Sequence, residues 1–294
     1  QEVNWWVDAF TDDMTHLAQQ KFSKFRSCVR NKSITGNSTF FERLAPSAAK
    51  AKATRHQLTP IADVDHSRRK VTMEDWQWGD LVDAEDVRRM LVDPVGAYSK
   101  NAGMALARKW DELIIGSDGQ ATPAIVTTGG MLGGATDGTG AAVAFDTTNQ
   151  RIVSGSTGMT VAKMRTAKSI MDGNDVDEMD RYMALGPSQI DDLLGTTEVT
   201  SQDYNTVRAL ASGEIDTFLG FKIIMSTRLP LVTAERACVA WQKNAVGLAV
   251  CSDIKVRKDE RPDLSYALQV YAEFTANATR IDDAGVVMIM NTEA

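Results

Sequence analysis

Glycine-rich and acidic stretches are the first places in this sequence where chemistry could be sought. Residues 129–134 read Gly-Gly-Met-Leu-Gly-Gly. The backbone amides of such a loop cradle phosphate when the loop opens a helix and continues into Gly-Lys-Ser or Gly-Lys-Thr. Neither tripeptide follows here, so we interpret the run as a flexible turn and not as a nucleotide site.

The acidic stretch at residues 172–178 reads Asp-Gly-Asn-Asp-Val-Asp-Glu and is similar to the start of a calcium loop. An EF-hand loop needs glycine at its sixth position and glutamate at its twelfth. Asp177 occupies the sixth position and the twelfth holds no glutamate. We therefore interpret the stretch as a solvated acidic turn.

The histidines offer no better candidate for catalysis or metal binding. Asp65, His66 and Ser67 are the residue types of a proton relay, but adjacent side chains in an extended segment point in opposite directions. His16, His56 and His66 show no metal-ligand spacing. We therefore predict no catalytic group, no cofactor and no metal, and do not expect an enzyme.

A basic run and a tryptophan pair are the candidates for contacts with other molecules. Arg68, Arg69 and Lys70 are consecutive, and such a run serves as a phosphate contact, a solvated face or a partner contact. Trp76 and Trp78 alternate with polar residues as in a strand. They are equally consistent with the edge of a core and with an anchor between subunits, where tryptophan is enriched.

The net charge of −7 conceals an uneven distribution. Residues 15–70 contain 12 Lys and Arg against 3 Asp and Glu, whereas residues 111–294 contain 15 against 25. An acidic chain is not typical of a dedicated nucleic-acid binder, because such proteins hold phosphates through basic residues. The two regions are instead electrostatically complementary to each other.

Composition indicates a globular chain of one large or two smaller domains, with 294 residues, 43% hydrophobic and 24% charged. Three widely spaced cysteines support neither a disulfide framework nor a zinc site and favour a reducing cytoplasm. No apolar run approaches the roughly 20 residues of a membrane helix, and no signal peptide is apparent. We therefore expect a soluble protein.

Apolar spacing predicts an amphipathic helix over residues 5–30, and the polar stretch at 31–65 is predicted to be a linker or an extended arm. A short helix with acidic residues around it is predicted to end near Met90. The clearest helix begins at Asp93-Pro94, a cap followed by proline at the first helical position, and ends at Gly116. Residues 116–158 are predicted to form a surface hairpin or insertion.

The later part of the chain is predicted to alternate short helices and strands. Helices are predicted at 160–171 and 187–194, and strands at 182–185, 215–218, 221–226, 254–258, 264–276 and 286–290. The strands at 215–218 and 221–226 form a predicted hairpin. A turn at 282–285 is predicted to join the last two strands.

Several short segments, taken in order, resemble one protein family. They are His66-Ser67-Arg68-Arg69, Trp76-Gln77-Trp78-Gly79-Asp80, Asp93-Pro94 with Tyr98 and Asn101, Gly186-Pro187, Gly220-Phe221-Lys222-Ile223-Ile224, and residues 241–250. From about His66 to its end the chain resembles the major capsid proteins of tailed bacteriophages with the Hong Kong 97-type fold. The sequence departs from the expected pattern at Asp180-Arg181, where Gly-Arg would precede a strand.

The resemblance implies an α+β fold in five parts. These are an N-terminal arm (1–58), an extended loop with a linker helix (59–92), a peripheral domain with a long spine helix and a hairpin insertion (93–159), an axial domain (160–250) and a return to the peripheral domain (251–294). Candidate contacts between subunits lie in the arm and the loop: Phe10, Met14, Leu17, His66, Arg68, Arg69, Trp76 and Trp78.

The function implied is self-assembly, through pentamers and hexamers, into an icosahedral shell that encloses double-stranded DNA without sequence-specific binding. Portal, scaffolding and decoration proteins are the implied partners, the bacterial cytoplasm is the implied place of assembly, and no membrane is involved. An encapsulin-like compartment subunit that encloses cargo proteins shares this fold and is the alternative. A soluble enzyme that uses residues 172–180 is a remote third.

Overall fold

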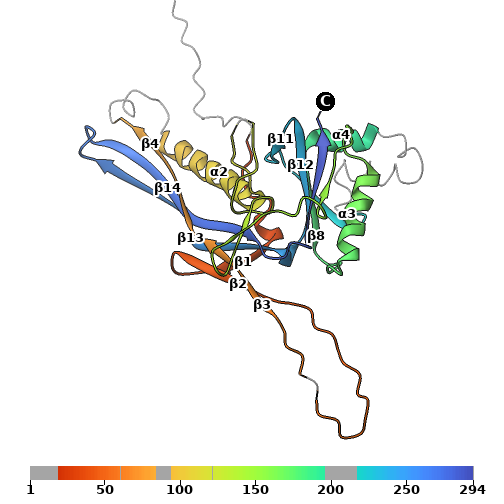
Figure 1. Cartoon of the computed structure of the whole chain (residues 1–294). Helices are drawn as coiled ribbons and strands as arrows, with labels where there is room; N and C mark the ends of the chain where they lie inside the picture. The colour runs from red at the N-terminus through yellow and green to blue at the C-terminus, as the bar shows by residue number, and fades with distance from the viewer. Residues whose placement is uncertain (1–18, 60, 84–93, 121, 196–216, 294) are drawn as a thin grey trace, which may run out of the picture. The chain divides into compact units, whose positions relative to one another are not determined.

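The computed structural model describes residues 19–59, 61–83, 94–120, 122–195 and 217–293. The chain divides into two compact units (Figure 1). The described residues of 1–23, 75–109 and 252–275 form the first, and those of 24–74, 110–251 and 276–294 form the second. Phe10, Met14 and Leu17 lie outside the described residues.

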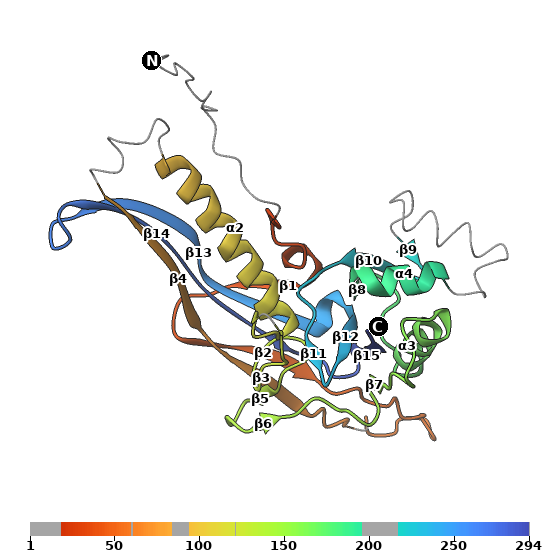
Figure 2. The same ribbon diagram turned by 90° about the horizontal axis from the view of Figure 1, so that it is seen from above.

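The first unit combines one long helix with a strongly curved part of a sheet (Figure 2). Its elements are β4 (Glu74–Val82), most of α2 (Pro94–Ile115), and the outer parts of β13 (Val246–Arg261) and β14 (Ala267–Arg280). Strand β14 lies between β13 and β4. Its side chains alternate, with Val270, Ala272 and Phe274 buried and the intervening residues half-buried and polar, as expected of a sheet with one covered face.

The second unit contains a seven-stranded mixed sheet with two helices. The strand order is β7 (Arg151–Ile152), β15 (Val286–Thr292), β12 (Glu235–Gln242), β8 (Arg181–Leu185), β10 (Phe221–Met225) and β9 (Thr217–Phe218), and β11 (Leu231–Val232) pairs with β12. Helix α3 (Val161–Gly173) packs on β15 and β7, and α4 (Pro187–Gly195) follows β8. All five residues of β8 are buried, which is consistent with its unbroken apolar run.

A four-stranded sheet completes the second unit. It consists of β2 (Ser38–Leu44), β3 (His66–Thr72), β5 (Ala135–Asp137) and β6 (Ala142–Val143), in that order. The same unit contains the short helices η1 (Arg26–Cys28) and η3 (Lys243–Ala245), and β1 (Arg30–Ser33), which pairs with β13 in parallel.

Most of the elements predicted from apolar spacing are confirmed. Helix α2 begins at Pro94 and ends at Ile115, as its cap and proline predict. Helix α3 begins after Thr160, whose side chain accepts a hydrogen bond from the Lys163 amide. The hairpin around residue 220 is formed by β9 and β10.

The helix predicted over residues 5–30 was wrong in its described part. Residues 19–30 form no continuous helix: residues 26–28 form only the short helix η1, and the Phe25 ring packs against Trp241 with ring centres 5.6 Å apart. The predicted turn at 282–285 does lie between the last two strands, but these strands do not pair with each other, since β15 pairs with β12 and β7. The short helix predicted to end near Met90 lies outside the described residues.

Candidate functional site

The segment between β2 and β3, residues 45–65, is the most exposed part of the second unit, and we call it the β2–β3 loop (Figure 1). At its base the Ala45 amide donates a hydrogen bond to the Asp65 carbonyl at 3.0 Å. Beyond this base the described residues are almost all exposed, including Leu58 at 91% and Ile61 at 87%. Leu58 and Ile61 are the most exposed large apolar side chains among the described residues.

The tip of the β2–β3 loop is shaped by local hydrogen bonds. The Gln57 side-chain oxygen accepts from the Ala53 amide at 2.7 Å and from the Thr54 amide at 3.2 Å. His56, which lies between Thr54 and Gln57 in the sequence, adopts a left-handed backbone with φ of 58°. These bonds close a turn, so the loop presents a defined end although it contains no helix or strand.

The base of the loop is fixed by an apolar cluster. Phe41 on β2 packs with Val71, Ala249 and Ile281, all of which are buried. Gly247 makes this packing possible, since a Cβ at that position would lie 2.7 Å from the Phe41 ring. The loop therefore projects from a rigid base.

A carboxylate surrounded by arginines lies beside this base. Asp283 Oδ2 is 2.6 Å from Arg69 Nη2, and Asp283 Oδ1 is 2.6 Å from Arg280 Nε. Arg43 approaches the same carboxylate at 3.9 Å. Arg280 is fully buried and Arg69 is 6% exposed, so Asp283 neutralises charge that would otherwise be costly to bury.

Arg280 also contacts the glycine-rich run, which contains the predicted turn but is held by contacts within the chain and so is not flexible as predicted. Its guanidinium donates to the carbonyls of Met131 and Gly133 at 3.0 and 2.9 Å. The amides of residues 131 and 132 donate to the carbonyls of residues 114 and 115 and so cap the end of α2. Gly130 is needed because a Cβ there would lie 2.4 Å from Gly116. The amides that could cradle phosphate are used within the chain.

The similarity to known proteins supports a structural role for these surfaces. A family model described as phage capsid protein matches residues 3–293. The chain belongs to this family. It is the major capsid protein of a phage, the subunit from which an icosahedral shell is built. No curated protein matches the chain.

Solved structures show the same fold at low sequence identity. The capsid structure of cyanophage P-SCSP1u has a chain that is 18% identical in sequence to this one and superimposes with a TM-score of 0.70. The match covers 99% of this chain and 94% of the cyanophage chain. The head of Helicobacter pylori bacteriophage KHP40 is 10% identical with a TM-score of 0.72 and covers 99% of both chains. The Hong Kong 97-type fold is thereby confirmed, and nothing in these similarities favours an encapsulin-like compartment.

The side chains around the basic run on β3 lie in two different environments, one exposed and one buried. Along β3 the side chains of His66 and Arg68 are exposed, whereas Arg69 is buried against Asp283. Alternation along a strand produces this division. The prediction that Arg68 and Arg69 both contact a neighbouring subunit is therefore corrected for Arg69, which is bound within its own subunit.

The tryptophan pair lies on β4 in the first unit and is half-buried. The Lys109 ammonium lies 4.1 Å from the centre of the Trp76 ring, a cation–π contact. The Trp76 indole nitrogen is buried and donates to no described acceptor. These contacts favour the edge of a core for Trp76 and do not test a contact between subunits.

Sequence reasoning missed the anchor of the N-terminal segment. The buried Asp111 carboxylate accepts from the backbone amides of Lys24 and Phe25, at 3.1 and 3.3 Å. The Trp241 indole donates to the Cys28 carbonyl at 2.9 Å. Residues 24–44, assigned to the arm by the sequence, are therefore part of the second unit. The acidic Asp111 within the apolar stripe of α2 is the sequence feature from which this contact could have been suspected.

The remaining chemical candidates have structural roles. Asp172 pairs with the buried Arg181 at 2.5 Å, while Asp175, Asp177 and Glu178 are exposed. Among the described residues no group of three or more His, Cys, Asp and Glu side chains could hold a metal ion. No described helix is long and apolar enough to span a membrane.

Proposed function

We propose that copies of this capsid protein form pentamers and hexamers in which the β2–β3 loop of one subunit reaches over an adjacent subunit. The assembled shell would enclose double-stranded DNA without reading its sequence. The single observation that carries this proposal is the exposure of Leu58 and Ile61 on a loop with a fixed base. Covering them against a neighbour would remove apolar surface from water, at ~25 cal/mol for each Å².

Charge supports the same arrangement. The region that contains the arm and the loop, residues 15–70, is basic, and residues 111–294 are acidic. Contacts between different surfaces of identical subunits form rings when the rotation closes. Complementary charge on those two surfaces favours the correct register and accelerates encounter. The net charge of −7 limits adhesion of the shell to the enclosed DNA.

The five parts implied by the family resemblance are kept as part of this proposal, and the β2–β3 loop at 45–65 spans the end of the proposed arm and the start of the proposed extended loop. The arm residues Phe10, Met14 and Leu17, and the strand residues His66, Arg68, Trp76 and Trp78, are proposed contacts between subunits. Portal, scaffolding and decoration proteins are proposed partners, and assembly is proposed to occur in the host cytoplasm.

Replacing residues 46–64 by a two-residue Asn-Gly turn tests the proposal. Ala45 and Asp65 are already joined by a hydrogen bond, so a short turn closes the β2–β3 pair without strain. We expect the variant to unfold at the same temperature as the full chain but to give no closed particles in electron micrographs. The double variant Leu58→Ser, Ile61→Ser keeps the loop length and isolates the apolar contribution. Particles of normal diameter from the shortened variant would contradict the proposal.

A further inference from the structure

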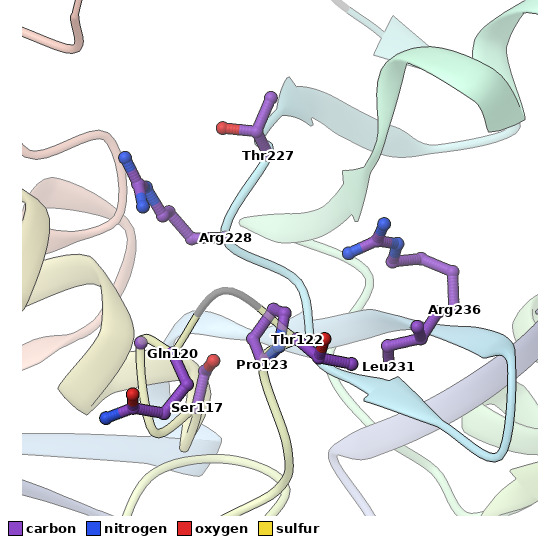
Figure 3. A pocket seen from close by; sticks show the side chains of 9 residues that line it. Ser117, Gln120, Thr122, Pro123, Thr227, Arg228, Leu231 and Arg236 are labelled. Atoms are coloured by element: carbon purple, nitrogen blue, oxygen red, sulfur yellow. The ribbon is translucent and has the colours of Figure 1, made fainter.

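A cavity of about 260 Å³ in the second unit is not used by any surface described above (Figure 3). Its walls come from described residues that follow α2 (117, 119, 120, 122 and 123) and from residues 227, 228, 231 and 236. The Leu231 amide donates to the Pro123 carbonyl at 2.5 Å and ties the two walls together. The cavity is therefore built by the fold. Its volume is below that of pockets for drug-sized ligands, so it suits a small ion or a single side chain.

Two buried polar groups in this lining have no hydrogen-bond partner among the described residues. Ser117 is 2% exposed and its Oγ is unpartnered, and the Nε of Arg228 is also buried and unpartnered. An unsatisfied buried donor costs roughly 1–3 kcal/mol, so such groups are uncommon unless a ligand or water satisfies them.

Arg228 and Arg236, the two arginines in the lining, differ in how closely a carboxylate pairs with each guanidinium. Arg236 makes a two-pronged ion pair with Glu293, at 2.7 and 3.2 Å, and donates to the Leu229 carbonyl at 2.8 Å. The Arg228 side chain is 33% exposed, and it faces the carboxylate of the buried Glu112 at 3.8 Å, beyond hydrogen-bond distance. A donor-rich wall with one incompletely paired guanidinium is suited to an acceptor that carries negative charge.

We propose that this cavity binds a small oxyanion, a carboxylate or a phosphate, through the Ser117 hydroxyl and the Arg228 guanidinium. The carboxylate would come from an acidic side chain of a second copy in the shell, and the phosphate would be the free ion. Both present oxygen acceptors to the same two donors. The binding chemistry does not depend on the assembly proposed above.

Thermal unfolding of unassembled subunits in inorganic phosphate tests the site. Sodium chloride of equal ionic strength controls for screening. We expect phosphate to raise the Tm of the natural chain by about 2–4 °C once it exceeds its Kd tenfold, and expect Arg228→Gln to abolish that rise. Arg257→Gln is the matched control, because Arg257 is 61% exposed and pairs with Glu273 at 3.5 Å; it should retain the full response.

Ser117→Ala distinguishes a binding role from a packing role. Removing an unsatisfied hydroxyl should leave the Tm without phosphate unchanged or raised, while the response to phosphate falls by half or more. If the natural chain and Arg228→Gln respond equally to phosphate, the orphaned groups are satisfied by water and the proposal is wrong.

Assembled shells identify the source of the oxyanion. If a neighbouring subunit supplies a carboxylate, added phosphate leaves the Tm of natural shells unchanged and Arg228→Gln lowers it. If the ion is free phosphate, added phosphate raises the Tm of natural shells as it does that of subunits. Either result supports an oxyanion site and selects one source.

Discussion

The Arg69 guanidinium and the Asp283 carboxylate, 214 positions apart in the sequence, meet at 2.6 Å and join the base of the β2–β3 loop to the turn before β15. Asp283 also pairs with the fully buried Arg280. One carboxylate therefore compensates two arginines that water does not reach. This contact and the apolar cluster around Phe41 both hold the base of the loop.

Asp283→Asn should lower the free energy of unfolding by about 2–4 kcal/mol. Removing one partner of a buried ion pair typically costs about 3–5 kcal/mol, and the exposed third of the Asp283 side chain moderates that cost. Asp282→Asn is the matched control, because Asp282 is 52% exposed and lies 3.8 Å from Arg43; it should change stability by less than about 0.5 kcal/mol. Denaturant unfolding of unassembled subunits measures both, and equal effects would show that the arginines are compensated elsewhere.

Arg68→Glu and Arg69→Glu should separate assembly from folding. Arg68 is exposed on β3, so its reversal should leave the Tm of the subunit within about 1 °C and reduce particle yield, because it opposes an acidic neighbouring surface. Arg69→Glu places a second carboxylate against Asp283 and should lower the Tm by several degrees. Melting curves and particle counts are the two measurements. If Arg68→Glu lowered the Tm while particle yield stayed normal, its role in assembly would be refuted.

Asp180 stands where the family resemblance predicts glycine, and its backbone is left-handed with φ of 53°. Asparagine, aspartate and glycine tolerate this conformation, whereas a β-branched residue does not. Asp180→Gly should therefore change the free energy of unfolding by less than about 0.5 kcal/mol, since the surface ion pair with Lys222 contributes little. Asp180→Val should cost about 1–3 kcal/mol. Equal costs for the two variants in chemical denaturation would exclude backbone strain as the cause.

Cys238 should make the subunit less stable at alkaline pH. Burial raises the pKa of its thiol from an ordinary value of 9.0 to about 12. Between these values the unfolded chain has released a proton that the folded chain retains, so stability falls as pH rises, by up to about 1.4 kcal/mol for each pH unit. Cys238→Ser has no group that ionises there and should flatten this part of the profile.

The difference between the two profiles from pH 8 to 11 isolates Cys238. Burial also raises the pKa of Cys28, but that residue is present in both chains and its effect cancels. Parallel profiles for the natural chain and Cys238→Ser would mean that the buried thiol ionises normally.

Local signals made much of the fold predictable. Proline after a capping residue marks the start of α2, Thr160 marks the start of α3, and an unbroken apolar run marks β8. Each of these signals acts within a few residues of the element it specifies. The sequence predicted a linker or arm over residues 31–65, and the structure confirms a segment without helix or strand only in the described residues of 45–65. Strands β1 and β2 lie within residues 30–44, and the pairing of β2 with β3 that sets the start of the loop is a contact between distant residues.

Contacts between distant parts of the sequence were not predictable in this way. Arg280 holds the run at 129–134, and Asp111 holds the amides of Lys24 and Phe25. Nothing near either partner specifies the other. The glycine-rich run was misinterpreted because glycine permits both a mobile turn and a close approach of two backbones. Pairing of β15 with β12 is equally nonlocal.

Electron cryomicroscopy of the assembled particle tests the central claim most directly, because it shows where residues 45–65 of each subunit lie. We predict a closed shell in which these residues cross onto an adjacent subunit, with Leu58 and Ile61 covered by it. A closed shell in which the β2–β3 loop folds back on its own subunit, or remains exposed to solvent at Leu58 and Ile61, would contradict it.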